Sequence, residues 1–263
     1  MYINGIDIFV TEHLVKNSKA NLIIVHGIAE HSGRYKHVVK YFYDNGFNVI
    51  TYDLRGHGKS GGKRGYVKSF HDHIDDLHEV VKHVKTLNNQ KVFLIGHSMG
   101  GAIVHMYEAK YHDVDGIISS AAASNTPKSS RVLKYIGFWY IGFVKISSKM
   151  FADHLSYDPN VKEDNLSDPL NLKFMYIKLI GEMMVKGAKY IQKSLTSFKT
   201  PILYIHGKDD HIVEPVISEK TFLKNKSLDK ILLTYDHAKH ELFNEYIKEE
   251  VFEDCKEWIV ERL

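Results

Sequence analysis

The sequence from residue 92 to residue 101 reads VFLIGHSMGG, an apolar run that leads into the pattern Gly-x-Ser-x-Gly. A serine between two glycines is typical of a very tight turn from a strand into a helix, because glycines let neighbouring backbone pass close to the serine. The five-residue pattern alone is weak, but an apolar strand-like run precedes it and Ala102-Ile103-Val104 open a helical pattern after it. This context predicts that Ser98 is a nucleophile rather than part of a structural glycine–serine turn.

Short apolar runs rich in β-branched residues alternate along the chain with longer stretches of helical period. Nearly continuous apolar strands are expected in a parallel sheet that helices cover on both faces. The alternation therefore predicts an α/β fold with a doubly wound, mostly parallel sheet. The predicted strands are 22–25, 48–52, 92–95, 116–119, 202–205 and 231–234, and the predicted helices are 35–45, 70–87, 99–111, 215–223 and 242–263.

The interval from residue 122 to residue 199 breaks this alternation, because it separates two predicted strands and contains no clear strand itself. Within it, residues 132–151 and 172–198 are rich in aromatic, Met and aliphatic residues and look helical. A structureless loop of this length is uncommon in a compact domain. We therefore expect 122–199 to be a helical lid inserted into a core made of 1–121 and 200–263.

A serine nucleophile needs a base and an acid, which follow it along the chain of such enzymes in the order Ser, Asp or Glu, His. The predicted strand 202–205 is followed by Asp209 and Asp210, and the last predicted strand is followed by His237 and His240. The order and the positions fit a catalytic triad. Of the two histidines, His240 lies where the loop turns into the last predicted helix, and His237 competes with it.

Three motifs make the chain resemble the α/β-hydrolases of the monoacylglycerol lipase and lysophospholipase group, which are serine aminopeptidase-like hydrolases. The motifs are HGIAEHSGRY at 26–35, DLRGHGKS at 53–60 and GHSMGG at 96–101. The resemblance runs over nearly the whole length and implies an α/β-hydrolase fold.

The resemblance also favours one residue of each candidate pair, Asp209 with Asp210 and His237 with His240. The acid of that family follows a glycine by three positions, as Asp210 follows Gly207, and the family's histidine precedes Glu and an apolar pair, as His240 does. It thus implies a triad of Ser98, Asp210 and His240. In such a triad the histidine takes the serine's proton, and the aspartate holds the correct tautomer and stabilises the imidazolium.

Backbone amides are the expected donors to the oxyanion of the reaction. One is that of Met99, directly after the nucleophile, and the second is that of Ile28 in the first motif. Glu30 and Arg34 belong to the same motif. They either form a polar rim that contacts substrate or make an ion pair that fixes the loop, and both interpretations stay open.

Aromatic residues in the expected lid argue for a lipid substrate. We expect Phe138, Trp139 and Phe143 to contact the acyl chain, with packing of the lid against the sheet as the alternative. The run 136–141 is apolar enough to touch a membrane or micelle surface transiently.

Together these features predict a serine ester hydrolase that cleaves a monoacylglycerol or a lysophospholipid through an acyl-enzyme intermediate, with no cofactor. A carboxylesterase or thioesterase for short or non-lipid acyl esters would use the same triad. A non-catalytic binding module of the same fold is the alternative from another class, although such proteins usually lose a triad member.

The composition bears on three further questions: a nucleic-acid partner, the cell compartment and a metal site. The 263 residues include 35 Lys and Arg and 32 Asp and Glu, and a net charge of +3 is too balanced to suggest a nucleic-acid partner. A lone cysteine, Cys255, and an N-terminus without signal-peptide features favour the cytoplasm. Seventeen histidines invite a metal, but His71 and His73 are two apart on a predicted helix and would diverge, so we expect no metal site. The oligomeric state stays open.

Overall fold

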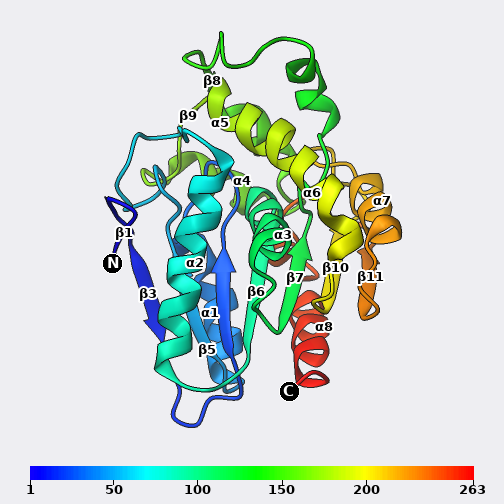
Figure 1. The fold of residues 1–263 in the computed structure, drawn as a ribbon. Helices are drawn as coiled ribbons and strands as arrows, with labels where there is room; N and C mark the ends of the chain where they lie inside the picture. Colours follow the sequence, from blue (N-terminus) through cyan, green and yellow to red (C-terminus); the bar gives the residue numbers. More distant parts are fainter.

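A seven-stranded sheet forms the centre of the computed structural model, which describes residues 1–263 (Figure 1). Its strand order is β11-β10-β7-β6-β4-β5-β3, and every neighbouring pair is parallel except β3 with β5. The predicted doubly wound, mostly parallel sheet is thus confirmed. The strands are β3 (Val10–His13), β4 (Asn21–Val25), β5 (Asn48–Tyr52), β6 (Val92–His97), β7 (Gly116–Ser120), β10 (Ile202–Gly207) and β11 (Lys230–Tyr235).

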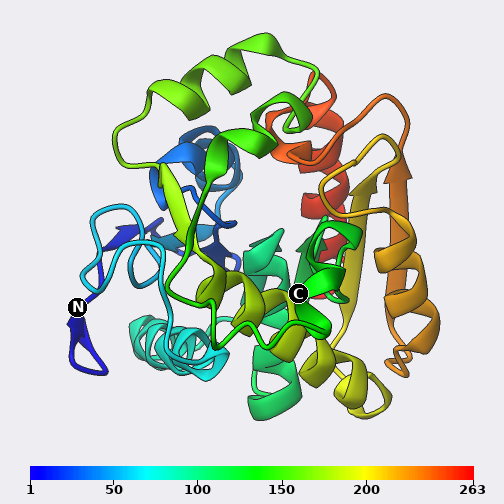
Figure 2. The ribbon, with the colours of Figure 1, turned by 90° about the horizontal axis from the view of Figure 1, so that it is seen from above.

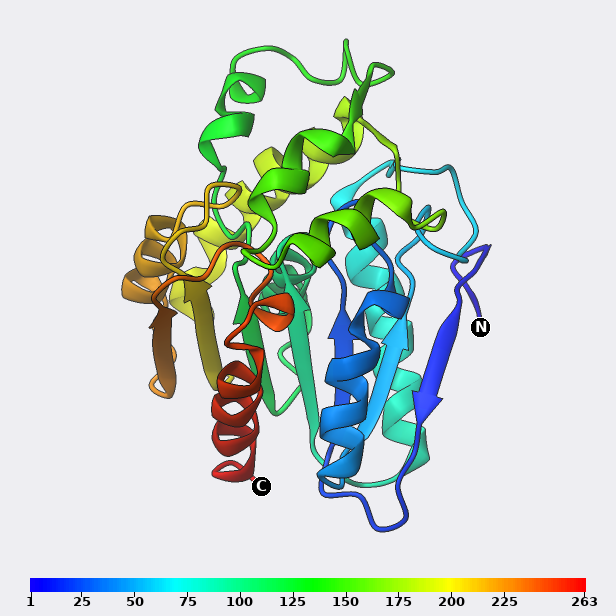
Figure 3. The ribbon, with the colours of Figure 1, turned by 180° about the vertical axis from the view of Figure 1, so that it is seen from behind.

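Two apolar cores, one on each face of the sheet, explain why the central strands are apolar throughout. In β4, Leu22 and Ile24 pack into one core while Ile23 and Val25 pack into the other. Figure 3 shows α1 (Lys36–Asp44) and α8 (Lys248–Val260) over one face, and Figure 1 shows the remaining core helices over the other. Those are α2 (Phe70–Leu87), α3 (Met99–Tyr111) and α7 (Val216–Lys224).

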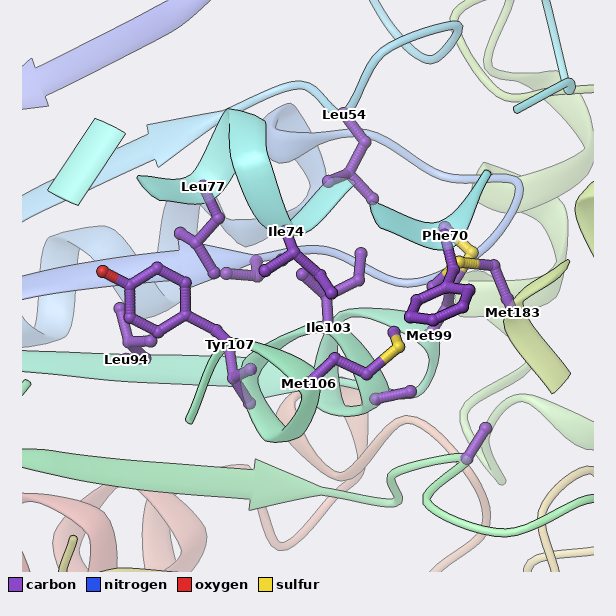
Figure 4. Packing of buried hydrophobic residues seen from close by; sticks show 14 of the residues in the cluster. Leu54, Phe70, Ile74, Leu77, Leu94, Met99, Ile103, Met106, Tyr107 and Met183 are labelled. Carbon is purple, nitrogen blue, oxygen red and sulfur yellow. The ribbon is translucent and has the colours of Figure 1, made fainter. Parts of the chain in front are cut away.

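The close packing of α2 on α3 anchors the helix that directly follows Ser98 (Figure 4). The side chain of Met99 is fully buried in this core, and Met183, from the interval 122–199, reaches the same cluster. The start of α3 is therefore fixed on both sides, by the sheet and by α2. The residues labelled in this cluster are Leu54, Phe70, Ile74, Leu77, Leu94, Met99, Ile103, Met106, Tyr107 and Met183.

Residues 122–199, which we call the insertion, lie mostly above the carboxyl ends of the strands, and their last helix, α6 (Ala188–Ser194), descends beside α3 along one face of the sheet (Figures 1 and 2). The prediction of a helix over 132–151 was wrong, because this stretch holds two 3₁₀ segments and a short strand, and Gly137 and Gly142 interrupt it. The stretch 172–198 is mostly helical, as predicted. The elements are η2 (Lys128–Lys134), β8 (Lys145–Ser147), η3 (Ser148–His154), α4 (Pro159–Ser167), β9 (Phe174–Tyr176), α5 (Ile177–Gly181), the π-helix η4 (Glu182–Gly187), α6 (Ala188–Ser194) and η5 (Leu195–Ser197).

Polar elements and very short strands are the ones that the sequence pattern missed. The edge strand β3 has no fully buried residue, and α4 buries none of its side chains, so neither shows an apolar stripe. The hairpin of β1 (Tyr2–Ile3) and β2 (Ile6–Asp7) and the antiparallel pair of β8 with β9 were also not expected.

Helix ends near the site differ slightly from the prediction. The stretch expected to be one helix from residue 242 begins as η6 (Leu242–Asn244), and α8 starts only at Lys248. Likewise η1 (Ser32–Tyr35) precedes α1.

No helix is both long enough and apolar enough to span a membrane.

Candidate active site

Ser98 lies on the sharp turn between β6 and α3, with backbone angles φ 54° and ψ −113°. Gly96 and Gly100 flank it, and a Cβ atom on either would collide with backbone: with the carbonyl of Gly100 in the first case and with that of Val25 in the second. The two glycines are thus required by close approach of the chain. The turn projects the Ser98 hydroxyl at the carboxyl end of the sheet.

Ser98, His240 and Asp210 form a continuous hydrogen-bonded array although they are far apart in the sequence. The Ser98 hydroxyl donates to Nε2 of His240 at 2.8 Å, and Nδ1 of His240 donates to Oδ2 of Asp210 at 2.7 Å. All three residues are buried. The structure therefore brings together the three residues that the sequence pointed to, in the geometry that general-base activation of a serine requires.

The electrostatics of the pair suit a base and its orienting acid. Burial alone would raise the pKa of the Asp210 carboxyl, but the charge of His240 and hydrogen bonds from His206 and His240 outweigh it and hold this pKa well below its usual range. Burial alone would lower the pKa of His240, yet the negative charge of Asp210 outweighs it and raises that pKa. This arrangement stabilises an imidazolium at His240.

The two competing candidates lie outside this array. Asp209 is half-buried, and its carboxylate accepts a hydrogen bond from the hydroxyl of Tyr157 at 3.1 Å. His237 is exposed, in the loop after β11. Neither side chain has a hydrogen bond to Ser98, Asp210 or His240.

The loop after β4 runs directly beside the nucleophile. A Cβ on Gly27 would lie 3.3 Å from Cβ of Ser98 and only 2.7 Å from Oε1 of Glu30, so a larger residue here would displace the Glu30 carboxylate. Ile28 follows Gly27 and lines the same space as Ser98. The amide of Met99 belongs to the first turn of α3, where amides have no partner within the helix.

Glu30 and Arg34 belong to a buried network of ion pairs and hydrogen bonds. Arg34 donates to both carboxylate oxygens of Glu241, at 2.7 and 2.8 Å, and to Glu30 at 3.0 Å, while Glu30 also accepts from the hydroxyl of Tyr35 at 2.8 Å. The structure shows the ion pair that fixes the loop, and it also places both residues in the wall of a small pocket that contains Ser98. Glu241, next to His240, was not singled out from the sequence, although its place beside the catalytic histidine was the available signal.

An apolar cavity of about 220 Å³ opens from Ser98. Its wall combines the loop after β4, the loop after β10 and several parts of the insertion. A smaller and more polar pocket lies on the other side of Ser98, against the ion-pair network, and includes Asn165 and His97. The apolar residues of the larger cavity are Ile28, Pro127, Val132, Leu133, Ile146, Met150, Phe151, Ile177, Ile180, Met184, Ile212 and Val213.

The aromatic residues expected to contact substrate do not lie in either wall. Phe138 is buried against Gly181, where a Cβ atom would collide with its ring. Trp139 and Phe143 are 59% and 74% exposed, on the outside of the insertion. The sequence gives no reason for this, because the path of the insertion decides which of its apolar side chains face the cavity.

The numerous histidines do not gather into a metal site. No group of three or more His, Cys, Asp or Glu side chains has an arrangement that could hold a metal ion. His73 is buried within the protein and His71 is exposed, so the two diverge on α2 as expected.

A mostly parallel α/β sheet with a serine, an acid and a histidine hydrogen-bonded at its carboxyl edge is the arrangement of α/β-hydrolases. The family model described as serine aminopeptidase, S33 (Hydrolase_4) matches residues 16–246. The chain belongs to this family of serine hydrolases, which confirms the fold and the enzyme class expected from the sequence.

Relatives support the same assignment. A monoacylglycerol lipase of Mycolicibacterium smegmatis is 31% identical over 256 residues, which cover 92% of this chain and 88% of that protein. An uncharacterized abhydrolase domain-containing protein of Dictyostelium discoideum is also 31% identical, over 93% of this chain, but the chain spans only 26% of that protein's length. The crystal structure of Paleococcus ferrophilus monoacylglycerol lipase superposes with a TM-score of 0.88 at 27% identity, covering 98% of this chain and 100% of that one.

Proposed function

We propose that the protein hydrolyses the ester of a monoacylglycerol, with Ser98 as nucleophile, His240 as general base and Asp210 as the acid that orients it. The observation that carries this proposal is the opening of the hydrogen-bonded array directly onto an apolar cavity. The similarity to two monoacylglycerol lipases supports the choice of glycerol as the alcohol. A lysophospholipid, which presents the same ester next to a larger alcohol, is the second candidate.

The reaction has two halves. The Ser98 oxygen attacks the ester carbonyl while its proton passes to Nε2 of His240, and collapse of the tetrahedral intermediate returns that proton to the leaving glycerol. Water then attacks the acyl-enzyme and gives a proton to Nε2 of His240, which passes it to the Ser98 oxygen as the fatty acid leaves. The amides of Ile28 and Met99 are the proposed donors to the oxyanion in both halves.

The two pockets bind different parts of the substrate. The apolar cavity accepts the acyl chain, because its wall is apolar except for Ser98, Ser129 and Ser130. The small pocket beside Asn165 and the ion-pair network accepts the alcohol. In this proposal the insertion acts as a lid, since it supplies part of both walls.

A substitution at Ile180 tests the proposal that the cavity binds the acyl chain. Ile180→Trp is expected to lower kcat/KM for the nitrophenyl ester of decanoate about tenfold or more while changing the value for butyrate little, because the added ring occupies acyl-chain space. The wild-type enzyme is expected to prefer decanoate over acetate across a C2–C16 panel. Leu223→Trp, at a position that is 72% exposed on α7, is the matched control. A wild-type preference for acetate would make the protein a small-ester esterase.

One surface of the insertion fits a lipid interface. Residues 128–152 contain five cationic side chains and no Asp or Glu, and several of their large apolar side chains are exposed. Val132 and Met150 are exposed on this surface and also line the acyl cavity, so the cavity lies beside it. The exposed apolar residues are Val132, Tyr135, Ile136, Trp139, Tyr140, Phe143, Val144 and Met150. We therefore propose that this surface docks transiently on membranes or micelles.

Trp139 and Phe143 test this surface. The double variant Trp139→Ala/Phe143→Ala is expected to co-sediment several-fold less with vesicles of phosphatidylcholine and phosphatidylserine than the wild type, because both rings are exposed there. Its kcat/KM on a soluble short-chain ester should not change. Leu223→Ala serves as the control of similar exposure. Equal sedimentation of the wild type and the double variant would argue against docking through this surface.

A further inference from the structure

We propose that His206 is a positioning residue of the triad, which holds Asp210 through the same carboxylate oxygen that His240 uses. The inference rests on the function proposed above for Ser98, Asp210 and His240. It adds a fourth side chain, from the interior of β10, to the chain of hydrogen bonds that ends at the nucleophile.

The hydrogen bonds of His206 determine which of its ring nitrogens carries the proton. Its Nε2 lies 2.9 Å from the carbonyl oxygen of Val213 and 3.0 Å from Oδ2 of Asp210, and both of these atoms accept. Nε2 must therefore be the donor. Nδ1 is then free to accept the hydroxyl of Ser218 at 2.7 Å. His206 has no exposed surface, so no water competes for these contacts.

Asp210 is held on every side by this arrangement. Its Oδ1 accepts the amides of Ile212 and Val213, at 2.8 and 3.0 Å, and its Oδ2 accepts from His206 and His240. A carboxylate with four donors has its plane fixed, and this plane aims Oδ2 at the base. Because His206 also bonds to the carbonyl of Val213, it ties the carboxylate to the loop after β10.

Loss of the hydrogen bond from His206 would change the negative charge that Asp210 presents to His240. With one donor fewer, more of the negative charge of Asp210 would be concentrated toward Nδ1 of His240, which favours the imidazolium. Since only neutral His240 can act as a base, the acid limb of the kcat/KM profile would move to higher pH. The loosened carboxylate would also lower kcat, while KM, which reflects the pockets, would change little.

The other titratable groups around His240 come from three separate elements. His97 ends β6 with its ring centroid 4.8 Å from that of His240, Glu30 lies in the loop after β4, and Glu241 follows His240 in the chain. Burial lowers the pKa of His97 to about 4, and Arg34 pairs with both glutamates. None of these groups contacts His206, so a shift of the acid limb on changing His206 would come through Asp210.

Three substitutions at position 206 separate positioning from packing. Gln places an amide nitrogen where Nε2 of histidine lies, Asn places one only where Nδ1 lies, and Leu removes both. The wild type and the His206→Gln, His206→Asn and His206→Leu variants are compared as full chains by kcat and KM against pH on a nitrophenyl ester. Melting temperature shows which variants are folded, and labelling of Ser98 in the wild type by a fluorophosphonate shows that the nucleophile is reactive.

We expect His206→Asn and His206→Leu to lose about 10- to 100-fold in kcat, as for a hydrogen bond to a charged group, with KM nearly unchanged and the acid limb at higher pH. His206→Gln is expected to retain the wild-type limb. If His206→Leu fails to fold, the comparison of Gln with Asn decides alone. Folded Gln and Asn variants with the same pH profile as each other would overturn the proposal. A wild-type protein that is neither labelled nor active would instead overturn the proposed function.

Discussion

Replacing Ser98 by alanine is expected to lower kcat for ester hydrolysis about 10⁵- to 10⁶-fold, the loss typical of a missing serine nucleophile. The backbone at this position has φ 54°, which alanine adopts about as readily as serine, and the smaller side chain meets no new contact. The fold should therefore survive. The measurements are kcat on a nitrophenyl ester and labelling by a fluorophosphonate, with the modified residue located by mass spectrometry.

Ser124→Ala is the matched control for this experiment. Ser124 is a buried serine that follows β7 at the same end of the sheet, and its hydroxyl pairs with that of Thr221 rather than with a histidine. This variant is expected to keep both label and activity. If the wild type neither hydrolysed the ester nor took the label, the chain would be a binding module of the α/β-hydrolase fold rather than an enzyme, whereas an active Ser98→Ala would show that another residue is the nucleophile.

The nucleophile and the sheet could be predicted because their signals are local. A parallel strand covered on both faces must be apolar along its length, as β4 and β6 are, and the turn at Ser98 needs glycines at fixed offsets. The triad order was also available, but the residues alone left Asp209 beside Asp210. Only the resemblance to a family, and then the hydrogen bonds, separated the two.

The apolar cavity and the ion-pair network could not be predicted in the same way, because their members meet only in the folded chain. Arg34 and Glu241 are 207 positions apart, and the cavity wall joins loops of the core to the insertion. In the insertion, Phe138 and Ile180 are both buried apolar residues, yet only Ile180 lines the cavity. The composition of the insertion shows how apolar it is. The direction of each of its side chains depends on the path of the chain, which tertiary packing determines.

Asp210→Asn is expected to lower kcat about 10⁴-fold, the loss typical of this change in a serine–histidine–aspartate triad. The amides of Ile212 and Val213 both donate to Oδ1, so the amide oxygen of asparagine would take that place and its NH₂ group would face Nδ1 of His240. A donor at this position forces Nδ1 to accept. The proton of neutral His240 then moves to Nε2, which can no longer accept the proton of Ser98.

Asp209→Asn is the matched control, one residue away and of the same chemistry. The Asp209 carboxylate contacts the hydroxyl of Tyr157 and no member of the triad, so kcat/KM should change less than about twofold. The same steady-state assay measures both variants, and a melting curve checks that each is folded. The reverse outcome, an impaired Asp209→Asn beside a normal Asp210→Asn, would mean that the acid in solution is not the one hydrogen-bonded to His240, and the loop after β10 would have to rearrange by a residue to supply it.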